Sequence, residues 1–261
     1  MNEITISSFS DLVEKLFDKS WDPKIKRFRS HYVFRGLSDE SYQLKTTLMR
    51  LGGNYAEMEK HLLRNFRKFA HRDVVPQDSI WNWLSLAEHH SLPTRLLDWT
   101  FSPLIAAHFA TCDVEKFNVN GAIWCVDFIA NRELLPTKLK SLLKKEGGFA
   151  LTVEMLNKAA KSLDEFDALS RSKFVAFFEP PSLDERIVNQ HALFSVMSNP
   201  RALLDDWLKK HPFLYRKIII PASLKWEIRD KLDKANITER VLFPGLDGLS
   251  SWLKRHYTPS F

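Results

Sequence analysis

The chain has 261 residues, 44% of them hydrophobic and 27% charged, values close to the averages of soluble globular proteins. This composition excludes a disordered chain, a collagen and a coiled coil, and the length predicts one or two domains with a sizeable core. Lys and Arg number 38 against 32 Asp and Glu, so the formal net charge is +6. That mild excess is compatible with an acidic or nucleic-acid partner but too small to identify one.

Several classes of binding site lack their sequence signatures. Only 8 glycines are present, none in a G-x-G-x-x-G or G-x-x-x-x-G-K-[ST] pattern, which disfavours dinucleotide-fold and P-loop chemistry. The two cysteines, Cys112 and Cys125, form no C-x-x-C pair, so we expect neither a disulfide framework nor a metal site. The N-terminus lacks the apolar core of a signal peptide, and no apolar run reaches the ~20 residues that span a bilayer. We therefore expect a cytoplasmic protein without a membrane partner.

The first half of the chain alternates predicted helices and strands. Residues 8–19 have apolar helical spacing, with Ser8 as the N-cap. Residues 31–35 are aromatic and β-branched and end at a glycine, which predicts a strand. Further helices are expected over 55–71 and 79–90, and Ser102 followed by Pro103 predicts the start of a buried helix.

The second half continues the same mixture. Residues 121–129 are continuously apolar and predict a central strand. Further strands are expected over 174–178, 193–197 and 215–220, and helices over 137–146, 151–163, 200–210, 221–236 and 246–256. The helix over 200–210 would begin at Asn199 and Pro200, and the Lys-rich stretch 131–170 would form a small helical insertion. We expect an α+β fold, a single compact mixed-sheet domain with surrounding helices.

Residues 86–110 carry the densest group of polar side chains, in a predicted helix-turn-helix passage. The group comprises Glu88, His89, His90, Thr94, Arg95, Asp98, Trp99 and Thr100. One interpretation is a structural corner in which Asp98 caps a helix or pairs with Arg95 and Trp99 lies in the core. The other is a pocket wall, where Trp99 offers an aromatic face and Thr100 and His90 offer hydrogen bonds.

Two further candidates lie outside this segment. Arg35 precedes Gly36 at the end of its strand, where it could grip a phosphate or carboxylate while the glycine lets the ligand approach the backbone. The alternative for Arg35 is an internal salt bridge with Asp98. Gln190 lies before a strand, and Ser182 with Glu185 predicts an ordinary capping box just upstream.

The helix over 55–71 has a basic side. Its cations recur at helical spacing at Lys60, Arg64, Arg67, Lys68 and Arg72. A solvated helix face explains this pattern, and a nucleic-acid contact is the alternative, which would make binding dependent on salt.

These residues resemble the FRG-domain family. The segment HYVFRG at 31–36 contains the Phe-Arg-Gly motif of that family, and LAEHHSLPTRLLDWT at 86–100 with the following Ser-Pro and Phe-Ala matches its long motif. Later family elements are Arg186, Gln190, Phe194 and LFPGLDG at 242–248, although His191 and Ala192 stand where a glycine is more frequent. The resemblance implies an FRG domain over 28–253, preceded by a helical segment at 1–27 and followed by a tail at 254–261.

More distantly, the chain resembles ADP-ribosyltransferases, which cleave NAD, and this resemblance implies an ADP-ribosyltransferase-like fold. The order of Arg35, the Asp98 to Ala110 passage and Gln190 is similar to theirs, but no Glu-x-Glu or Gln-x-Glu stands in a late strand. The resemblance implies catalytic roles for Arg35, Asp98 and Gln190. It implies NAD binding by the set Arg35, Gly36, His90, Thr94, Arg95, Trp99 and Thr100.

The FRG resemblance implies a bacterial toxin or phage-defence effector. It would transfer ADP-ribose from NAD to a macromolecule, either nucleic acid or protein, and a cognate antitoxin would be a further partner. The alternative is a non-catalytic module that binds a nucleotide or a protein. The two differ in turnover, because only an enzyme releases nicotinamide.

Overall fold

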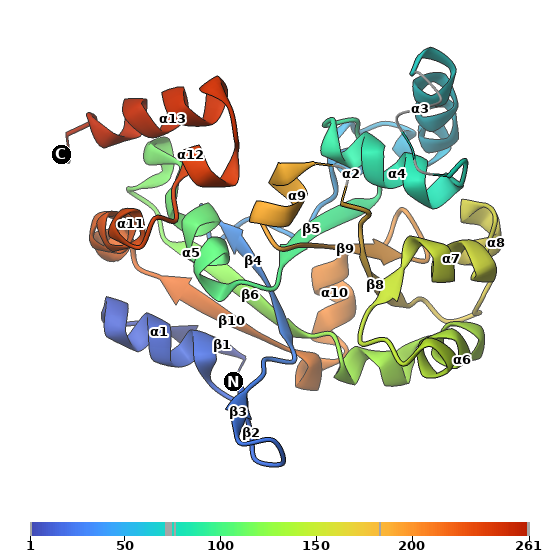
Figure 1. The fold of residues 1–261 in the computed structure, drawn as a ribbon, viewed down its shortest axis with the longest axis horizontal. Helices are drawn as coiled ribbons and strands as arrows, with labels where there is room; N and C mark the ends of the chain where they lie inside the picture. Colours follow the sequence, from blue (N-terminus) through green and yellow to red (C-terminus); the bar gives the residue numbers. More distant parts are fainter. Residues whose placement is uncertain (1, 71–74, 76, 183, 260–261) are drawn as a thin grey trace.

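The computed structural model describes residues 2–70, 75, 77–182 and 184–259. One mixed sheet of eight strands, in the order β1-β10-β6-β4-β5-β9-β8-β7, runs through the molecule (Figure 1). Its strands are β1 (Glu3–Thr5), β4 (Tyr32–Leu37), β5 (Leu96–Thr100), β6 (Gly121–Asp127), β7 (Leu151–Thr152), β8 (Val175–Glu179), β9 (Ala192–Met197) and β10 (Tyr215–Ile220). A separate hairpin is formed by β2 (Trp21–Asp22) and β3 (Arg27–Phe28). The predicted α+β fold with a mixed sheet is confirmed.

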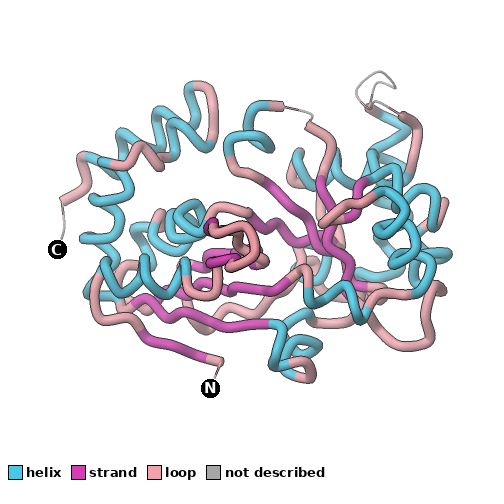
Figure 2. The backbone as a smooth tube through the Cα atoms, turned by 60° about the horizontal axis from the view of Figure 1, so that its bottom comes forward, coloured by secondary structure: helices cyan, strands magenta, loops and turns pink. Residues whose placement is uncertain are grey.

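Helices surround this sheet, as the tube in Figure 2 shows. In the N-terminal half they are α1 (Phe9–Phe17), α2 (Thr47–Arg50), α3 (Tyr55–Phe69), α4 (Ile80–His89) and α5 (Pro103–Thr111). In the C-terminal half they are α6 (Thr137–Glu146), α7 (Val153–Ala159), α8 (Leu163–Asp167), α9 (Glu185–Asn189), α10 (Leu204–Lys209), α11 (Lys225–Lys234), α12 (Glu239–Leu242) and α13 (Leu246–His256). Short 3-10 helices are η2 (Val114–Lys116), η3 (Ala130–Leu134), η4 (Pro212–Leu214) and η5 (Ala222–Leu224).

The core divides into three clusters according to the helices that cover the sheet. Helices α1, α5 and α11 pack on β4, β6 and β10. Helices α4, α6, α7 and α8 pack on β5, β8 and β9. Helix α10 packs on side chains from the other face of the strands. Phe34 of the first group and Thr100 of β5 are register partners, and Leu96 faces the second group. Because side chains alternate along a strand, Leu96, Asp98 and Thr100 lie on the same face of β5. The two groups of helices therefore cover one face of the sheet, and Asp98 and Thr100 point into the space between these groups.

Most predicted elements are present. Ser8 caps α1 as predicted, because its side chain accepts a hydrogen bond from the Asp11 amide. The strands predicted over 31–35, 121–129, 174–178, 193–197 and 215–220 correspond to β4, β6, β8, β9 and β10. The helices predicted at 55–71, 79–90, 137–146 and 246–256 correspond to α3, α4, α6 and α13, and the helix begun at Ser102 and Pro103 is α5.

Three local predictions were wrong. The 86–110 passage is not helix-turn-helix, because β5 lies between its two helices and pairs with β9 along its full length. The 200–210 helix starts only at Leu204, since the side chain of Asn199 instead binds the amide of Arg201 in a turn. The 151–163 helix is interrupted, and Ser162 caps the separate helix α8.

Residues 131–170, predicted as a helical insertion, form η3, α6, β7, α7 and α8. Leu139, Leu143, Leu156 and Phe166 of this stretch lie in the same buried cluster as Trp81 of α4, and β7 extends the main sheet beside β8. The indole of Trp81 also donates a hydrogen bond to the carbonyl of Ala160 at 2.9 Å. This stretch therefore shares a core with the rest of the fold. Among the described residues, no helix is both long and apolar enough to cross a membrane.

Candidate functional site

A pocket lies where strands β4 and β5 separate. The two strands share one register pair, Phe34 with Thr100, whereas β4 pairs with β6 along its whole length. Beyond that pair the strands enclose a pocket of about 150 Å³. Its lining comes from β4, β5, α5, α9 and β9, and comprises Phe34, Arg35, Gly36, Asp98, Trp99, Thr100, Phe109, Arg186, Gln190 and Ala192. The pocket thus gathers Arg35, Asp98 and Gln190, the predicted catalytic residues, from three distant parts of the chain.

Arg35 is the main cation of this pocket. Its side chain is 20% exposed, and its Nη1 donates a hydrogen bond to the main-chain carbonyl of Asp98 and lies 3.9 Å from the Asp98 carboxylate. A guanidinium has five N–H donors. The Nε–H of Arg35 is buried with no partner among the residues that the structure describes. Arg35 therefore keeps donors for a ligand, even though the internal contact with Asp98 exists.

Two carboxyl groups beside Arg35 differ in their environments. The Asp98 side chain is 58% exposed at the pocket. Glu88, at the end of α4, accepts a hydrogen bond from the hydroxyl of Thr94. Burial, followed by the charge of Asp98, raises the pKa of Glu88 to about 8. Near neutral pH the site therefore holds a protonated Glu88 close to the exposed side chain of Asp98, and groups with strongly shifted pKa values gather at functional sites.

The packing of α5 against β4 leaves no room for a side chain at Gly36. A Cβ at this position would lie 1.9 Å from the carbonyl oxygen of Ala106 and 2.7 Å from the amide nitrogen of Ala110, both in α5. The buried alanines of α5 allow the helix backbone to lie directly on β4. This close approach brings Phe109 of α5 to the pocket wall.

Thr100 and Gln190 join the pocket to the C-terminal helices. The Thr100 hydroxyl donates to the main-chain carbonyl of Gln190 at 2.7 Å and accepts from the amide of Ser102 at 3.0 Å. The Gln190 side-chain amide donates to the carbonyl of Leu242 in α12 at 3.0 Å. The predicted catalytic Gln190 thus lines the pocket while its side-chain amide is held by Leu242. The hydroxyl of Thr100 likewise holds the main chain at Gln190 and Ser102 in place.

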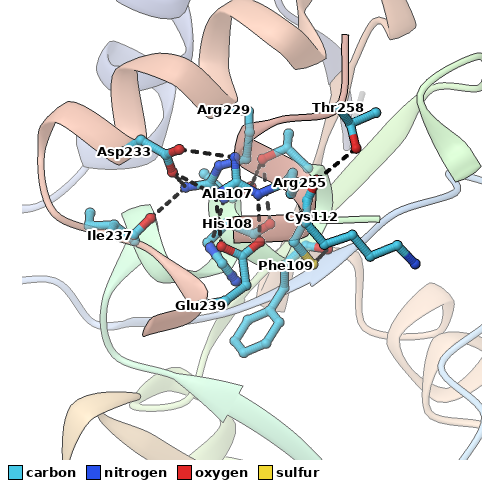
Figure 3. Close-up of polar contacts among 12 residues, drawn as sticks. Ala107, His108, Phe109, Cys112, Arg229, Asp233, Ile237, Glu239, Arg255 and Thr258 are labelled. Atoms are coloured by element: carbon cyan, nitrogen blue, oxygen red, sulfur yellow. Dashed lines mark hydrogen bonds and ion pairs between the residues drawn. The ribbon is translucent and has the colours of Figure 1, made fainter. Parts of the chain in front are cut away.

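The C-terminal helices are held by a buried cluster of charged groups (Figure 3). Arg255 of α13 donates to Glu239 of α12 at 2.6 and 2.7 Å and to Asp233 of α11 at 2.8 and 3.0 Å. Arg229 of α11 lies 2.7 Å from Nδ1 of His108 in α5. Burial and the charge of Arg229 lower the pKa of His108 to about 3. His108 is therefore neutral and accepts the Arg229 hydrogen bond, which ties α11 to α5.

A second pocket of about 500 Å³ adjoins the first at Arg186. It is lined by His89, His90, Asp184, Glu185, Arg186, Phe243, Pro244, Asp247 and Gly248. The Arg186 guanidinium lies over the Phe243 ring, 4.9 Å from its centroid. The predicted ligand residue His90 therefore faces this second pocket rather than the first.

The α9 end of the second pocket is fixed by Asp184. Asp184 contacts Nε2 of His89 and also caps α9 by accepting from the amide of Ile187. Asp184, and not the predicted Ser182, is thus the cap of this helix. One carboxylate connects the end of α4 to the start of α9.

Three of the residues that the resemblance predicts to bind NAD instead make hydrogen bonds or ion pairs within the protein. Arg95 is buried in an ion triad with Glu59, at 2.5 Å, and with Asp167, at 2.6 Å, so Asp98 is not its partner. The hydroxyl of Thr94 is directed to Glu88 and to the amide of Leu96. Trp99 is 3% exposed, and its indole donates to the Ser195 hydroxyl at 2.8 Å. Trp99 thus lies in the core, as the structural-corner interpretation predicts, whereas the Asp98–Arg95 pair of that interpretation is replaced by the triad with Glu59 and Asp167.

The basic side of α3 is partly neutralised by its neighbours. Lys60 lies 2.6 Å from Asp164, and Arg67 lies 2.8 Å from Asp78 while its guanidinium stands over the Trp83 ring. Arg64 lines a pocket of about 240 Å³ together with these two residues. Lys68 stands over the ring of Phe69. Arg72, the last predicted contact, lies outside the described residues.

The sequence motifs include Glu88, Arg186 and Phe109, but no role in the site is predicted for these three residues. Glu88 is in the crowded polar segment, but only its burial beside Asp98 and Arg35 reveals its unusual environment. Arg186 joins both pockets, and Phe109 forms a wall. Their position depends on contacts between distant segments, for which the local sequence carries no signal.

No curated protein and no solved structure matches the chain. One protein-family model does match, and it covers the two strands that carry Arg35 and Asp98 together with α5. The remainder of the predicted domain, up to residue 253, lies beyond this match. Residues 30–119 match the family model described as the FRG domain, which supports the FRG-family resemblance for this segment of the chain.

Proposed function

We propose that the Arg35 pocket binds NAD and that the protein transfers ADP-ribose from it to a macromolecular acceptor, nucleic acid or protein. The observation that carries the proposal is the Arg35 guanidinium, which lines the pocket with a buried, unpartnered Nε–H among the described residues. Arg186 adds a second guanidinium to the lining. With Glu88 protonated, two cations face the single carboxylate of Asp98, a balance that suits a diphosphate.

The space beside Arg35 accommodates only part of such a ligand. The pocket of about 150 Å³ is smaller than the ~300–1,000 Å³ usual for small-molecule sites. The adjoining pocket of about 500 Å³ shares Arg186 and adds the Phe243 ring. NAD would place its nicotinamide ribose beside Asp98, its diphosphate between Arg35 and Arg186, and its adenosine in the second pocket.

The residues around the nicotinamide ribose supply the chemistry. NAD carries a cationic leaving group: the bond from ribose C1′ to the nicotinamide nitrogen breaks, both electrons stay on that nitrogen, and neutral nicotinamide leaves. The Asp98 carboxylate stabilises the positive charge that develops on the ribose. An acceptor oxygen or nitrogen then bonds to C1′, and its proton passes to Asp98, which is exposed at the pocket.

Such a reaction fits the toxin or phage-defence role that the FRG resemblance implies, because it consumes NAD and modifies a macromolecule. A cognate antitoxin would then be the partner that restrains it. The non-catalytic alternative, a module that binds a nucleotide or a protein, uses the same two guanidinium groups without turnover.

Nicotinamide release distinguishes the two functions. We expect the purified protein to release nicotinamide from NAD, with stimulation by RNA, DNA or cell lysate according to the acceptor. Asp98→Asn should lower the rate by about 100-fold or more, the size expected when a charge-stabilising group is lost. Asp230→Asn, at an exposed position of α11, is the matched control and should react like the wild type. NAD binding without release under every condition would support the binding module instead.

A further inference from the structure

The β2–β3 hairpin forms an exposed projection that the site described above does not use. It stands apart from the eight-stranded sheet and extends from the bottom of the fold in Figure 1. Trp21 is 52% exposed and Phe28 is 62% exposed. Their ring centroids are 5.2 Å apart in an edge-to-face arrangement, and the two residues are register partners. Both rings therefore lie on one face of the hairpin, accessible to solvent.

Cationic side chains surround these rings. Residues 19–29 contain five cations and one carboxylate, and the cations are Lys19, Lys24, Lys26, Arg27 and Arg29. All five are exposed. Within the described part of the chain, none of the ion pairs involves any of them. The carboxylate, Asp22, accepts a hydrogen bond from the amide of Lys24 and so stabilises the turn.

This surface differs from the basic side of α3. On α3, Lys60 and Arg67 each lie within 3 Å of a carboxylate, at 2.6 and 2.8 Å. On the hairpin five cations accompany one carboxylate, and they lie beside two exposed aromatic rings. Exposed aromatic rings among cations are the pattern on which single-stranded nucleic acids bind, because bases stack on the rings while phosphates contact the cations.

We propose that the β2–β3 hairpin is a binding site for single-stranded nucleic acid, with bases stacked on Trp21 and Phe28 and phosphates held by the surrounding lysines and arginines. A duplex fits less well, since its bases are stacked on one another and cannot reach the rings. An anionic membrane also fits less well. The tip carries Lys24 and Lys26 on either side of Ile25, whereas both aromatic rings lie at the base of the hairpin. Inserting that tip into lipid would bury the two charges.

The test is fluorescence anisotropy of the full chain with labelled oligothymidine and oligouridine of about 20 nucleotides, long enough for a usual single-strand site. We expect Trp21→Leu with Phe28→Leu to weaken binding about tenfold or more, because leucine keeps apolar contact but removes the stacking faces. Replacing Lys24, Lys26 and Arg27 by Gln should weaken binding and flatten the plot of log affinity against log salt by about 2.

The matched control replaces the α3 cations Lys60, Arg64 and Lys68 by Gln and should bind like the wild type. Unchanged thermal unfolding and circular dichroism should show that each variant is folded, as expected for a hairpin outside the main sheet. The proposal would be overturned by failure of the wild type to bind either oligonucleotide at about 50 mM salt. It would also be overturned by hairpin variants that bind normally, or by preferential binding to duplex DNA or to phosphatidylserine vesicles. Nicotinamide release without nucleic acid is measured in the same variants, so that failure here is distinguishable from failure of the NAD chemistry.

Discussion

Gly36 in β4 lies directly against the carbonyl oxygen of Ala106 in α5, so that a methyl group on Gly36 would approach this oxygen to 1.9 Å. No rotation of a side chain relieves such a contact, because the main chain fixes the position of a Cβ and the atom it meets is a main-chain oxygen. The glycine after Arg35 is therefore required for α5 to lie on the sheet, and α5 in turn supplies Phe109 to the pocket.

Gly36→Ala should destabilise the fold by about 3 kcal/mol, the upper part of the range for overpacking. Gly121→Ala is the matched comparison, since its Cβ would lie 2.8 Å from the carbonyl of Ala110, and about 1 kcal/mol is expected there. Urea unfolding followed by tryptophan fluorescence measures both. Equal stability of the Gly36 variant and the wild type would show that α5 does not need this close approach.

The Arg95 triad should be structural. Glu59→Gln removes one of the two carboxylates that hold the buried Arg95 and leaves Asp167 as its partner, so a loss of about 3 kcal/mol is expected, the lower end of the range for breaking a buried ion pair. Glu57→Gln, on the same helix but exposed, should cost less than about 1 kcal/mol. Thermal unfolding with and without NAD provides the readout. A Glu59 variant that is fully stable but no longer binds NAD would place Arg95 in the ligand site instead.

Glu88 should make the folded protein less stable as the pH rises from about 4.5 to about 8. Its pKa in the folded protein is about 8, raised from the ordinary value of 4.5, so the folded state holds a proton that the unfolded state has released. The contribution is therefore complete below about pH 4.5 and is lost as the pH rises towards 8, with a slope of at most about 1.4 kcal/mol per pH unit. Glu88→Gln should remove this slope when urea unfolding is measured from about pH 5 to pH 8. Parallel curves for the two proteins would mean that Glu88 is ionised in the folded state.

His108 should make the folded protein less stable as the pH falls, the opposite of the pH dependence expected from Glu88. Its pKa falls from 6.5 to about 3 in the folded protein, so its contribution to stability is complete above about pH 6.5. That contribution is lost as the pH falls towards 3, because the unfolded state takes up a proton first. His108→Gln retains an oxygen that can accept from Arg229, and it should flatten this acid limb. The wild type and the variant are compared by thermal unfolding between about pH 4 and pH 7. A variant with the same acid sensitivity as the wild type would assign the loss to other groups.

The sequence predicted most of the fold because its apolar runs are distinct. The continuous run at 121–129 predicts β6, and the periodic spacing at 55–71 predicts α3. Strand β5 was missed because LLDWT follows a turn and carries Asp98 towards the pocket, which breaks the apolar pattern. The helix near residue 200 was placed too early because Asn199 and Pro200 suit a turn as well as a helix start.

The residues of the site were predicted only in part, because the sequence does not show which side chains of a polar segment face the pocket. Arg35 lies within β4, Asp98 lies within β5 and Gln190 ends α9, and the three meet in one pocket. Arg95 and Trp99 belong to the same dense segment but face the core. Which member of a polar segment faces the pocket depends on how β5 pairs with β9 and separates from β4, and that pairing joins residues almost a hundred positions apart.

The central claim is that Arg35 holds the diphosphate of NAD, and calorimetric titration tests it most directly. NAD and ADP-ribose are titrated into the wild type, Arg35→Ala and Arg171→Ala, the last being an exposed arginine outside both pockets. We expect both ligands to bind the wild type and the Arg171 variant equally. Arg35→Ala should weaken both about tenfold or more, as for loss of a charge-assisted contact. Unchanged affinity in a folded Arg35 variant, or no binding of either ligand to the wild type, would contradict the claim.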